Sequence, residues 1–370
     1  MSSNHRRDSF SNVSLEEKQL DENPTSNNSD SARPETKDAK KKFVKRAVNV
    51  AKLLVLALVI LWLAKTLSEN WNEISQYQWR PRYGWLVVSG LFYLLAYFPS
   101  ASFWFLSLRW LGQRPNYFRS VQAFYYSQLG KYVPGKAMVA IIRSGMVSGP
   151  NVRPSIAVVG VFYETLTMMG TGAFIGAIIV FCFAREHWFY SLLALAVALA
   201  SIVPLTPPIF ARVLKVLRVG KNDPQVEESL GKLKFSYLFK GLCLMTILWV
   251  CFGLSLWASI LGLGIEPGSL LVELPRFIAI VGLSTTLGFA VPISPGGLGI
   301  REGVLSALLV PYFAAILNDP SNADWNVAPE AVATIVSIVQ RITSIIAEIA
   351  IVLVFFSVSF FTPKKTQAQS

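Results

Sequence analysis

Residues 165–184, TLTMMGTGAFIGAIIVFCFA, decide the fold, because this long stretch contains no charged side chain. A helix needs roughly 20 predominantly apolar residues to cross the hydrocarbon core of a bilayer, and this stretch has that length. Only 15% of the whole chain is charged and 53% is apolar, whereas about a quarter of a soluble protein is charged. The sequence therefore predicts a polytopic membrane protein, and four more uncharged stretches support it: residues 83–108, 187–211, 241–265 and 277–300.

The net charge of +12 does not indicate a nucleic-acid partner. The polar segment 1–46 holds 10 basic and 8 acidic residues, which leaves 24 basic and 14 acidic residues for the remainder. The positive excess thus belongs to the part predicted to lie in the membrane. We therefore expect membrane phospholipids as partners and no nucleic acid.

The distribution of basic residues predicts the topology, because loops rich in Lys and Arg stay in the cytoplasm. Residues 1–42 are polar and are predicted to form a disordered cytoplasmic tail with no signal peptide, followed by a transmembrane domain over 43–363 and a cytoplasmic tail over 364–370. The first helix is expected at 48–67. Residues 109–153 and 212–240 are basic and predicted to be cytoplasmic, so helices at 83–108, 154–184, 188–207 and 241–263 alternate between them.

The predicted architecture is an all-α polytopic membrane protein of about eight transmembrane helices. Both termini are expected in the cytoplasm, and the membrane is expected to be the bacterial cytoplasmic (inner) membrane. The sequence does not indicate an oligomeric state, although Gly172 and Gly176 form one GxxxG spacing, which we interpret as close packing inside the fold.

Two segments rich in proline and glycine interrupt the apolar pattern. The first joins two short apolar runs at Pro134 and Gly135, and the second contains Pro292 and Pro295. Unpaired backbone groups are tolerated at membrane depth only inside protein or beside a wet cavity, which favours re-entrant or broken helices and a possible inverted repeat. The alternatives are an interfacial hairpin for the first segment and an ordinary turn between two helices for the second.

These two segments also carry a family resemblance. Residues 128–136, QLGKYVPGK, and residues 292–303, PISPGGLGIREG, resemble paired signatures of the lysylphosphatidylglycerol synthase transmembrane-region family, over roughly residues 45–360. The family includes the flippase half of the multiple-peptide-resistance factor. The resemblance implies a flippase-like domain that handles phospholipids or lipid-linked headgroups. Because no soluble aminoacyl-transferase domain follows, lipid aminoacylation is not expected.

Two charged residues are expected near the middle of the membrane, Glu164 and Arg341. Each lies 11 residues, or about 16 Å of helix, beyond a predicted helix end. Buried charges of this kind are costly and usually mark a pathway or a paired interior site. Arg341 also belongs to a polar stripe at helical spacing, which predicts a cavity or proton-linked path; a structural Glu164–Arg341 ion pair is the alternative. The stripe consists of Thr334, Ser337, Arg341, Ser344 and Glu348.

The second signature has chemistry suited to an anion. Glycines allow close backbone approach, and a helix beginning near residue 298 would direct free N–H groups toward a phosphate. Arg301 adds a bidentate donor, and Glu302 is expected to pair with Arg301, to cap the helix or to take a proton. The candidate lipid- or phosphate-binding residues are Lys131, Lys136, Arg143, Gly296, Gly297, Gly299, Arg301 and Arg341. The alternative for the lysines is that they only orient the chain or touch anionic lipid.

No enzymatic motif accompanies these residues. The sequence has no GxSxG, HExxH, P-loop or CxxC pattern, so no metal and no cofactor is expected. The three cysteines, Cys182, Cys243 and Cys251, are expected to be buried thiols. The leading hypothesis is a flippase-like carrier of anionic or modified phospholipids. A membrane-embedded transferase acting on lipid-linked substrates through Glu164, Glu302 or Glu348, and a non-transporting partner of a separate lipid-modifying enzyme, are the alternatives.

Overall fold

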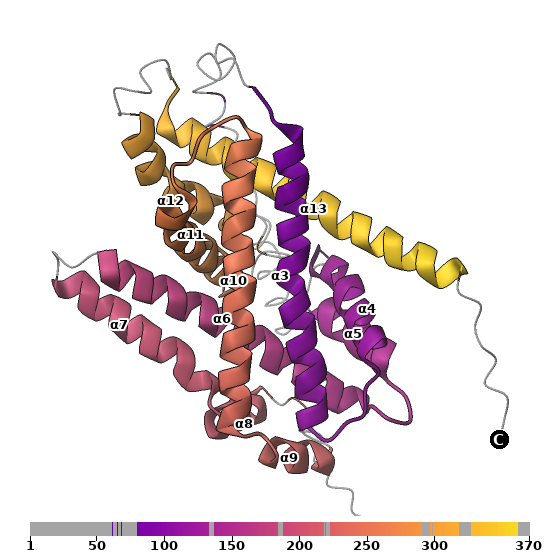
Figure 1. Ribbon diagram of the computed structural model, residues 1–370. Helices are drawn as coiled ribbons and strands as arrows, with labels where there is room; N and C mark the ends of the chain where they lie inside the picture. Colours follow the sequence, from indigo (N-terminus) through magenta and orange to yellow (C-terminus); the bar gives the residue numbers. More distant parts are fainter. Residues whose placement is uncertain are drawn as a thin grey trace, which may run out of the picture. The chain divides into compact units, whose positions relative to one another are not determined.

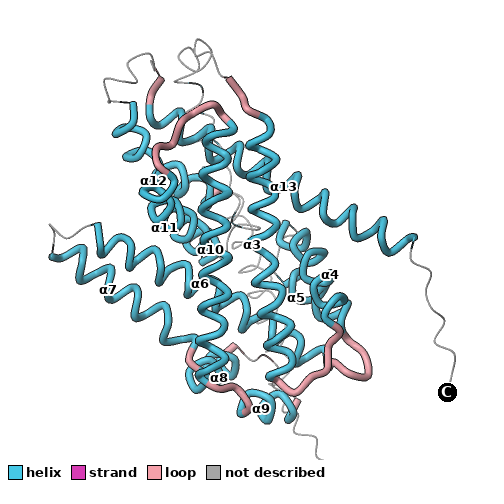
Figure 2. The backbone as a smooth tube through the Cα atoms, viewed as in Figure 1, coloured by secondary structure: helices cyan, strands magenta, loops and turns pink. Residues whose placement is uncertain are grey.

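The computed structural model describes residues 80–132, 137–183, 188–217, 219, 223–290, 297, 299–317 and 327–361, together with 61, 65 and 68. Within these residues the chain is helical and has no strand (Figures 1 and 2). The predicted tails, 1–42 and 364–370, and almost all of the predicted first helix at 48–67 lie outside the described residues.

The helices follow one another with short connections. In chain order they are α3 Tyr83–Trp110, α4 Tyr117–Gln128, the 3-10 helix η1 Leu129–Tyr132, α5 Ala137–Val147, α6 Pro154–Phe183, α7 Trp188–Ile202, the 3-10 helix η2 Val203–Leu205, α8 Pro207–Val216, α9 Pro224–Gly231, α10 Phe235–Gly262, α11 Leu270–Ala290, α12 Ile300–Leu317 and α13 Pro329–Phe361.

Six of these helices, α3, α6, α10, α11, α12 and α13, are long and apolar enough to cross a membrane. A seventh span is reached if the pair α7 and α8 is counted together, although the two are bent by 76°. One helix had been expected over 188–207. Pro204 lacks the backbone N–H that would continue the helix, and Pro207 begins α8 instead. The all-α polytopic class is confirmed.

The long helices α3 and α10 lie side by side through the described part of the chain (Figure 1). Serine hydroxyls join them in the interior, since Ser89 Oγ lies 2.8 Å from the Ser255 carbonyl oxygen and 2.7 Å from Ser259 Oγ. Small side chains let the two backbones approach, and hydroxyl hydrogen bonds then stabilise the contact without help from water.

Gly172 and Gly176 on α6 pack inside the fold, as the GxxxG interpretation expected. A Cβ atom on Gly172 would lie 2.4 Å from the Trp249 ring of α10, and one on Gly176 would lie 2.8 Å from Leu283 of α11. Both distances are far below van der Waals contact. The spacing therefore serves the packing of α6 against α10 and α11.

The two segments rich in proline and glycine differ in structure. The first joins α4 and α5, two short helices that pack against each other, as in either a re-entrant or an interfacial hairpin, and the re-entrant form stays a prediction. The second follows α11 and precedes α12, and each of these helices reaches the length of a span. For the second segment this favours the alternative, a turn between two crossing helices. The inverted repeat stays a prediction.

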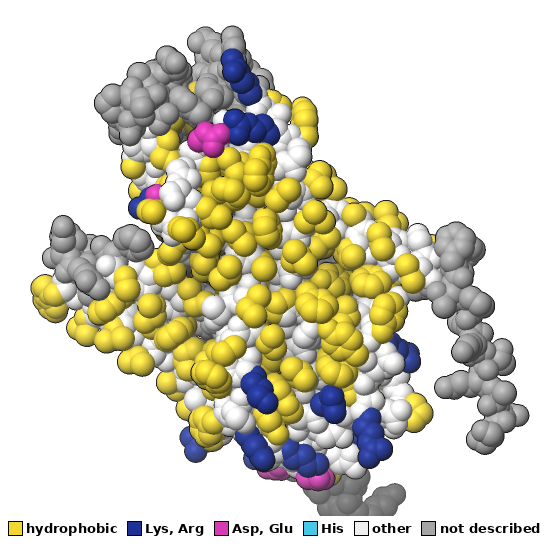
Figure 3. Space-filling model, viewed as in Figure 1, with side chains coloured by type: hydrophobic (Ala, Val, Ile, Leu, Met, Phe, Trp, Pro, Cys, Tyr) yellow, Lys and Arg dark blue, Asp and Glu magenta, His cyan; other side chains and the backbone are white. Residues whose placement is uncertain are grey.

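Side chains on the surface follow the pattern of a membrane protein. Figure 3 shows apolar side chains over most of the visible face and basic side chains gathered at the end where α8 and α9 lie. Leu91, Leu95 and Phe98 of α3 are half exposed, which is suited to lipid. The prediction of buried cysteines is wrong for Cys182 and Cys243, which are exposed, because these apolar stretches face outward there.

Candidate functional site

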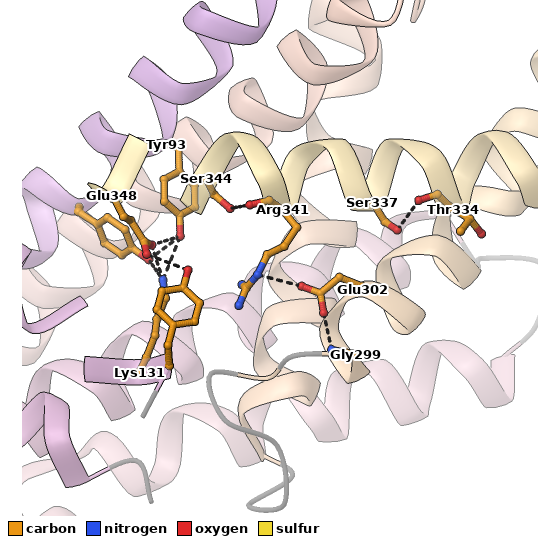
Figure 4. A network of polar contacts seen from close by, with 11 residues as sticks. Tyr93, Lys131, Gly299, Glu302, Thr334, Ser337, Arg341, Ser344 and Glu348 are labelled. Carbon is orange, nitrogen blue, oxygen red and sulfur yellow. Dashed lines mark hydrogen bonds and ion pairs between the residues drawn. The ribbon is translucent and has the colours of Figure 1, made fainter. Parts of the chain in front are cut away.

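Charged and tyrosine side chains from four elements meet in the interior of the described helices. We call this group the central cluster; Figure 4 shows it beneath α13. The members come from α3, η1, α12 and α13, elements that are far apart in the sequence. They are Tyr93, Tyr97, Lys131, Tyr132, Glu302, Arg341 and Glu348.

Lys131 lies at one side of the central cluster, against α13 and α3. Its ammonium forms an ion pair with Glu348 and donates to the hydroxyl oxygens of Tyr93 and Tyr97, at 3.3 and 3.4 Å. Tyr93 in turn donates to Glu348 at 2.6 Å, and Tyr132 donates to the other carboxylate oxygen at 2.9 Å. The Glu348 side chain is only 2% exposed, and a cation and two hydroxyls compensate for the burial of its negative charge.

Arg341 lies about two turns of α13 before Glu348, and its hydrogen bonding is incomplete. Its side chain is 8% exposed, and Nε lies 3.4 Å from Glu302 Oε1 as an ion pair. Neither Nε nor Nη2 has a hydrogen-bond partner among the described residues. A buried donor without an acceptor costs free energy, so these N–H groups indicate a place where a ligand or water would bind.

The start of α12 holds Glu302 in position. Its Oε2 accepts a hydrogen bond of 2.6 Å from the backbone N–H of Gly299, which caps the first turn. Gly299 has φ of +83°, a conformation that glycine adopts without strain. Of the three roles expected for Glu302, the structure therefore shows the cap, and it gives Arg341 as the ion-pair partner instead of Arg301.

Arg301 is partly buried on the first turn of α12, where a Cβ on Gly288 would come within 2.9 Å of its own Cβ. Its positive charge acts on Lys131, Tyr93 and Tyr97. Within the described residues it has no ion-pair or hydrogen-bond partner. The second signature, residues 292–303, thus brings the positive charge of Arg301, which has no ion-pair partner among the described residues, near Lys131 of the first signature.

A third buried ion pair does not involve the central cluster. Arg143 of α5 contacts Glu164 of α6 at 2.7 Å, and each side chain is 2% exposed. Arg143 Nε also donates to Ser127 at 3.0 Å, and its guanidinium carbon lies 4.1 Å from the centre of the Phe124 ring. Ser100 donates to Glu164. The expected alternative of a Glu164–Arg341 pair is wrong, because Arg143 is the partner that α5 supplies.

The polar stripe of α13 faces the interior of the fold, and all five of its members are buried. The hydroxyls of Ser337 and Ser344 are satisfied by carbonyl oxygens of their own helix, at 2.8 Å each. Thr334 pairs with Ser306 of α12 at 3.0 Å. Only the Thr334 hydroxyl therefore joins α13 to another helix, while Arg341 and Glu348 carry the charges of the stripe.

Several predicted residues lie outside the described part of the chain: Pro134, Gly135, Lys136, Pro292, Pro295 and Gly296. The described residues contain no group of histidine, cysteine and carboxylate side chains that could hold a metal ion. The three tyrosines of the central cluster were missed. The spacing of Tyr93 and Tyr97, one helical turn apart, was the available signal.

The central cluster contains residues of both sequence signatures, Lys131 from the first and Glu302 from the second. A comparison with known families then identifies the family of the chain. The family model for the lysylphosphatidylglycerol synthase transmembrane region matches residues 49–316. The chain belongs to this family. It is thus a multi-pass membrane protein of a family named for lipid chemistry, and Lys131, Arg301 and Glu302 lie inside the match. Helix α13, which supplies Arg341 and Glu348, lies beyond it. No curated protein and no solved structure matches the chain.

Proposed function

We propose that this member of the lysylphosphatidylglycerol synthase transmembrane-region family binds the headgroup of anionic or modified phospholipids at the central cluster and moves these lipids across the membrane. The observation that carries the proposal is the buried guanidinium of Arg341, whose Nε and Nη2 lack acceptors in the described residues. Guanidinium groups bind phosphate oxygens in a bidentate geometry, so a phosphodiester would satisfy these donors.

The formal charge around the site supports an anion. Within the central cluster the charges of Lys131 and Arg341 balance those of Glu302 and Glu348, and Arg301, which lies close enough for its charge to affect Lys131, adds one positive charge beside the cluster. The adjoining segments 133–136 and 291–298 contain one lysine and no acidic residue in the sequence. An uncompensated charge is costly in a membrane interior, so the excess favours a negatively charged ligand.

The depth of the cluster supports movement across the bilayer. Arg341 lies 12 residues after the start of α13, or about 18 Å along the helix. Twelve residues of α13 precede Arg341 and twenty follow it, so in a helix that crosses the hydrocarbon core of about 30 Å a headgroup bound there lies inside the core. A polar site of this kind inside apolar spans lowers the barrier that a charged headgroup meets in lipid.

Liposomes with acyl-labelled phosphatidylglycerol test the proposal directly. A membrane-impermeant reductant bleaches label in the outer leaflet, so the decay reports transbilayer movement. We expect wild-type protein to accelerate movement, and Arg341→Met to slow it by about 10- to 150-fold, the equivalent of losing one charge-assisted hydrogen bond of about 1.5–3 kcal/mol. Arg301→Ala is expected to act in the same direction.

Arg212→Ala is the matched control, because this arginine is exposed on α8, away from the central cluster. Its rate should equal that of the wild type. Equal rates for the wild type, Arg341→Met and Arg301→Ala would contradict the proposal.

The alternative functions give different products. The three carboxylates that a transferase could use, Glu164, Glu302 and Glu348, are each ion-paired with a cation. A transferase would change the mass of a lipid in cells that express the protein, whereas a carrier would only redistribute it. Mass spectrometry of total lipids separates the two. Co-purification of a lipid-modifying enzyme without lipid movement would indicate a non-transporting partner.

The proposed orientation places the basic end of the helices in the cytoplasm of a bacterial cell. Exposed cations gather where α3 ends and α10 begins, as positive-inside topology requires. These cations are Arg109, Arg114, Arg119, Arg153, Arg212, Lys215, Lys232, Lys234 and Lys240.

Single cysteines at Lys234 and Glu266, in a background without the native cysteines, test this orientation with an impermeant thiol reagent. The cysteine at position 234 should be labelled only after the membrane is opened, and the cysteine at position 266 in intact cells. The reverse pattern would overturn the orientation.

A further inference from the structure

The ammonium of Lys131 is held through oxygen atoms. Its Nζ lies 3.3 Å from the Tyr93 hydroxyl oxygen but 5.9 Å from the centre of that ring. For Tyr97 the corresponding distances are 3.4 and 5.7 Å. In both cases the hydroxyl oxygen lies between the ammonium and the ring, so the contact is a hydrogen bond and not an interaction with the ring face.

These oxygens complete a site for a primary ammonium. A lysine ammonium has three N–H donors, and three acceptors surround it: the hydroxyl oxygens of Tyr93 and Tyr97 and the carboxylate oxygen Oε1 of Glu348. We call these three oxygens the ammonium site. The tyrosine hydroxyls are arranged to accept from Lys131, because Tyr93 donates to Glu348 and pairs with Tyr97 at 2.9 Å.

We propose that Lys131 determines the headgroup specificity of the central cluster: it fills the ammonium site, so the cluster takes phosphodiester headgroups that lack an ammonium. The inference rests on the proposed function. It narrows the substrate class from anionic or modified phospholipids to anionic phospholipids without an ammonium, such as phosphatidylglycerol.

Two features of the cluster exclude a headgroup that carries its own ammonium. Lys131 is tethered to the site, so its effective concentration there exceeds that of a free competitor. Both carboxylates of the cluster are occupied as well, Glu348 by Lys131 and Glu302 by Arg341 and the N–H of Gly299. A second ammonium beside the phosphate would therefore meet cations and find no carboxylate without a partner.

Removal of the lysine should change this selection in a defined way. In Lys131→Ala the three acceptors lose their donor, and the formal charge of the cluster falls by one. The primary ammonium of phosphatidylethanolamine has the three N–H donors that the ammonium site needs. The quaternary ammonium of phosphatidylcholine has none, so it gains nothing from the vacated acceptors.

The transport test compares three acyl-labelled lipids in the liposome assay. The wild type should move phosphatidylglycerol at least tenfold faster than phosphatidylethanolamine. Lys131→Ala should raise the rate for phosphatidylethanolamine relative to phosphatidylglycerol by at least tenfold and leave phosphatidylcholine unchanged. Lys240→Ala is the matched control, because this lysine is exposed on α10, and it should keep the wild-type ratio.

A binding measurement separates this inference from the proposed function. In detergent, methylammonium should raise the melting temperature of Lys131→Ala, tetramethylammonium should not, and neither should act on the wild type. If no lipid moves but this pattern holds, the ammonium site stands and the transport proposal fails. An unchanged lipid ratio in folded Lys131→Ala overturns the specificity role. A wild type that moves phosphatidylethanolamine as fast as phosphatidylglycerol also overturns it, and this result does not depend on whether the variant folds.

Discussion

Replacing Arg143 by methionine removes the cation that pairs with Glu164, two side chains that are each 2% exposed. Methionine keeps the unbranched stem of Arg143 but not the guanidinium that lies over Phe124 and donates to Ser127, so the change removes the charge together with these contacts. Removing one partner of a buried pair costs about 3–5 kcal/mol, because the other charge stays buried without compensation. At roughly 2 °C per kcal/mol, Arg143→Met should lower the melting temperature by about 6–10 °C.

The double variant makes the prediction specific to the ion pair. Glu164→Gln alone leaves the arginine unpaired and should cost about as much as Arg143→Met. Arg143→Met with Glu164→Gln removes both charges, and replacing a whole buried pair is often nearly neutral. The double variant should therefore melt above either single variant.

Thermal unfolding in one detergent, followed by tryptophan fluorescence, measures the four proteins under matched conditions. Lys215→Met is the control, since Lys215 and Glu227 form an exposed ion pair, and exposed pairs contribute about 0–1 kcal/mol. If the losses of the two single variants add in the double variant, the two charges do not stabilise the fold as a pair, and the reasoning is refuted.

Two further predictions concern packing and pH. Gly172→Val should strongly reduce the yield of folded protein, because a Cβ would lie 2.4 Å from Trp249; size-exclusion chromatography measures it, and a normal yield would contradict the packing. A hydrogen bond from Ser155 lowers the pKa of Asp223 below its usual value of 3.8. The ionised carboxylate therefore stabilises the fold at pH values above 3.8, and this stabilisation is lost as the pH falls through the lowered pKa. Asp223→Asn should thus melt below the wild type at pH 7, and the gap should close under acid conditions; a gap that does not depend on pH would refute this.

The helices were predictable because charge-free stretches leave few ways to cross a bilayer. The uncharged stretch 83–108 lies inside α3, Tyr83–Trp110, and the predicted 154–184 corresponds to α6, Pro154–Phe183. Prolines after residue 203 explain the main difference, since α7 ends and α8 bends away from it.

The pairing of charges was not predictable from spacing alone. Equal depth suggested that Glu164 and Arg341 meet, but depth does not say which helix faces turn toward each other. Helix α5 brings Arg143 to Glu164, and α12 brings Glu302 to Arg341. The tyrosines were missed for another reason: the one-turn spacing of Tyr93 and Tyr97 is also that of ordinary packing on one helix face, and it indicates a site only once a buried charge is found beside it.

We propose that the free N–H groups of Arg341 bind a lipid phosphate. An electron cryomicroscopy map of the protein in nanodiscs of phosphatidylglycerol would show the bound headgroup. We expect a phosphate oxygen about 2.7–3.2 Å from Nη2 of Arg341, with Lys131 still on Glu348. A map in which protein oxygens satisfy the Arg341 guanidinium and no headgroup lies in the central cluster would contradict it.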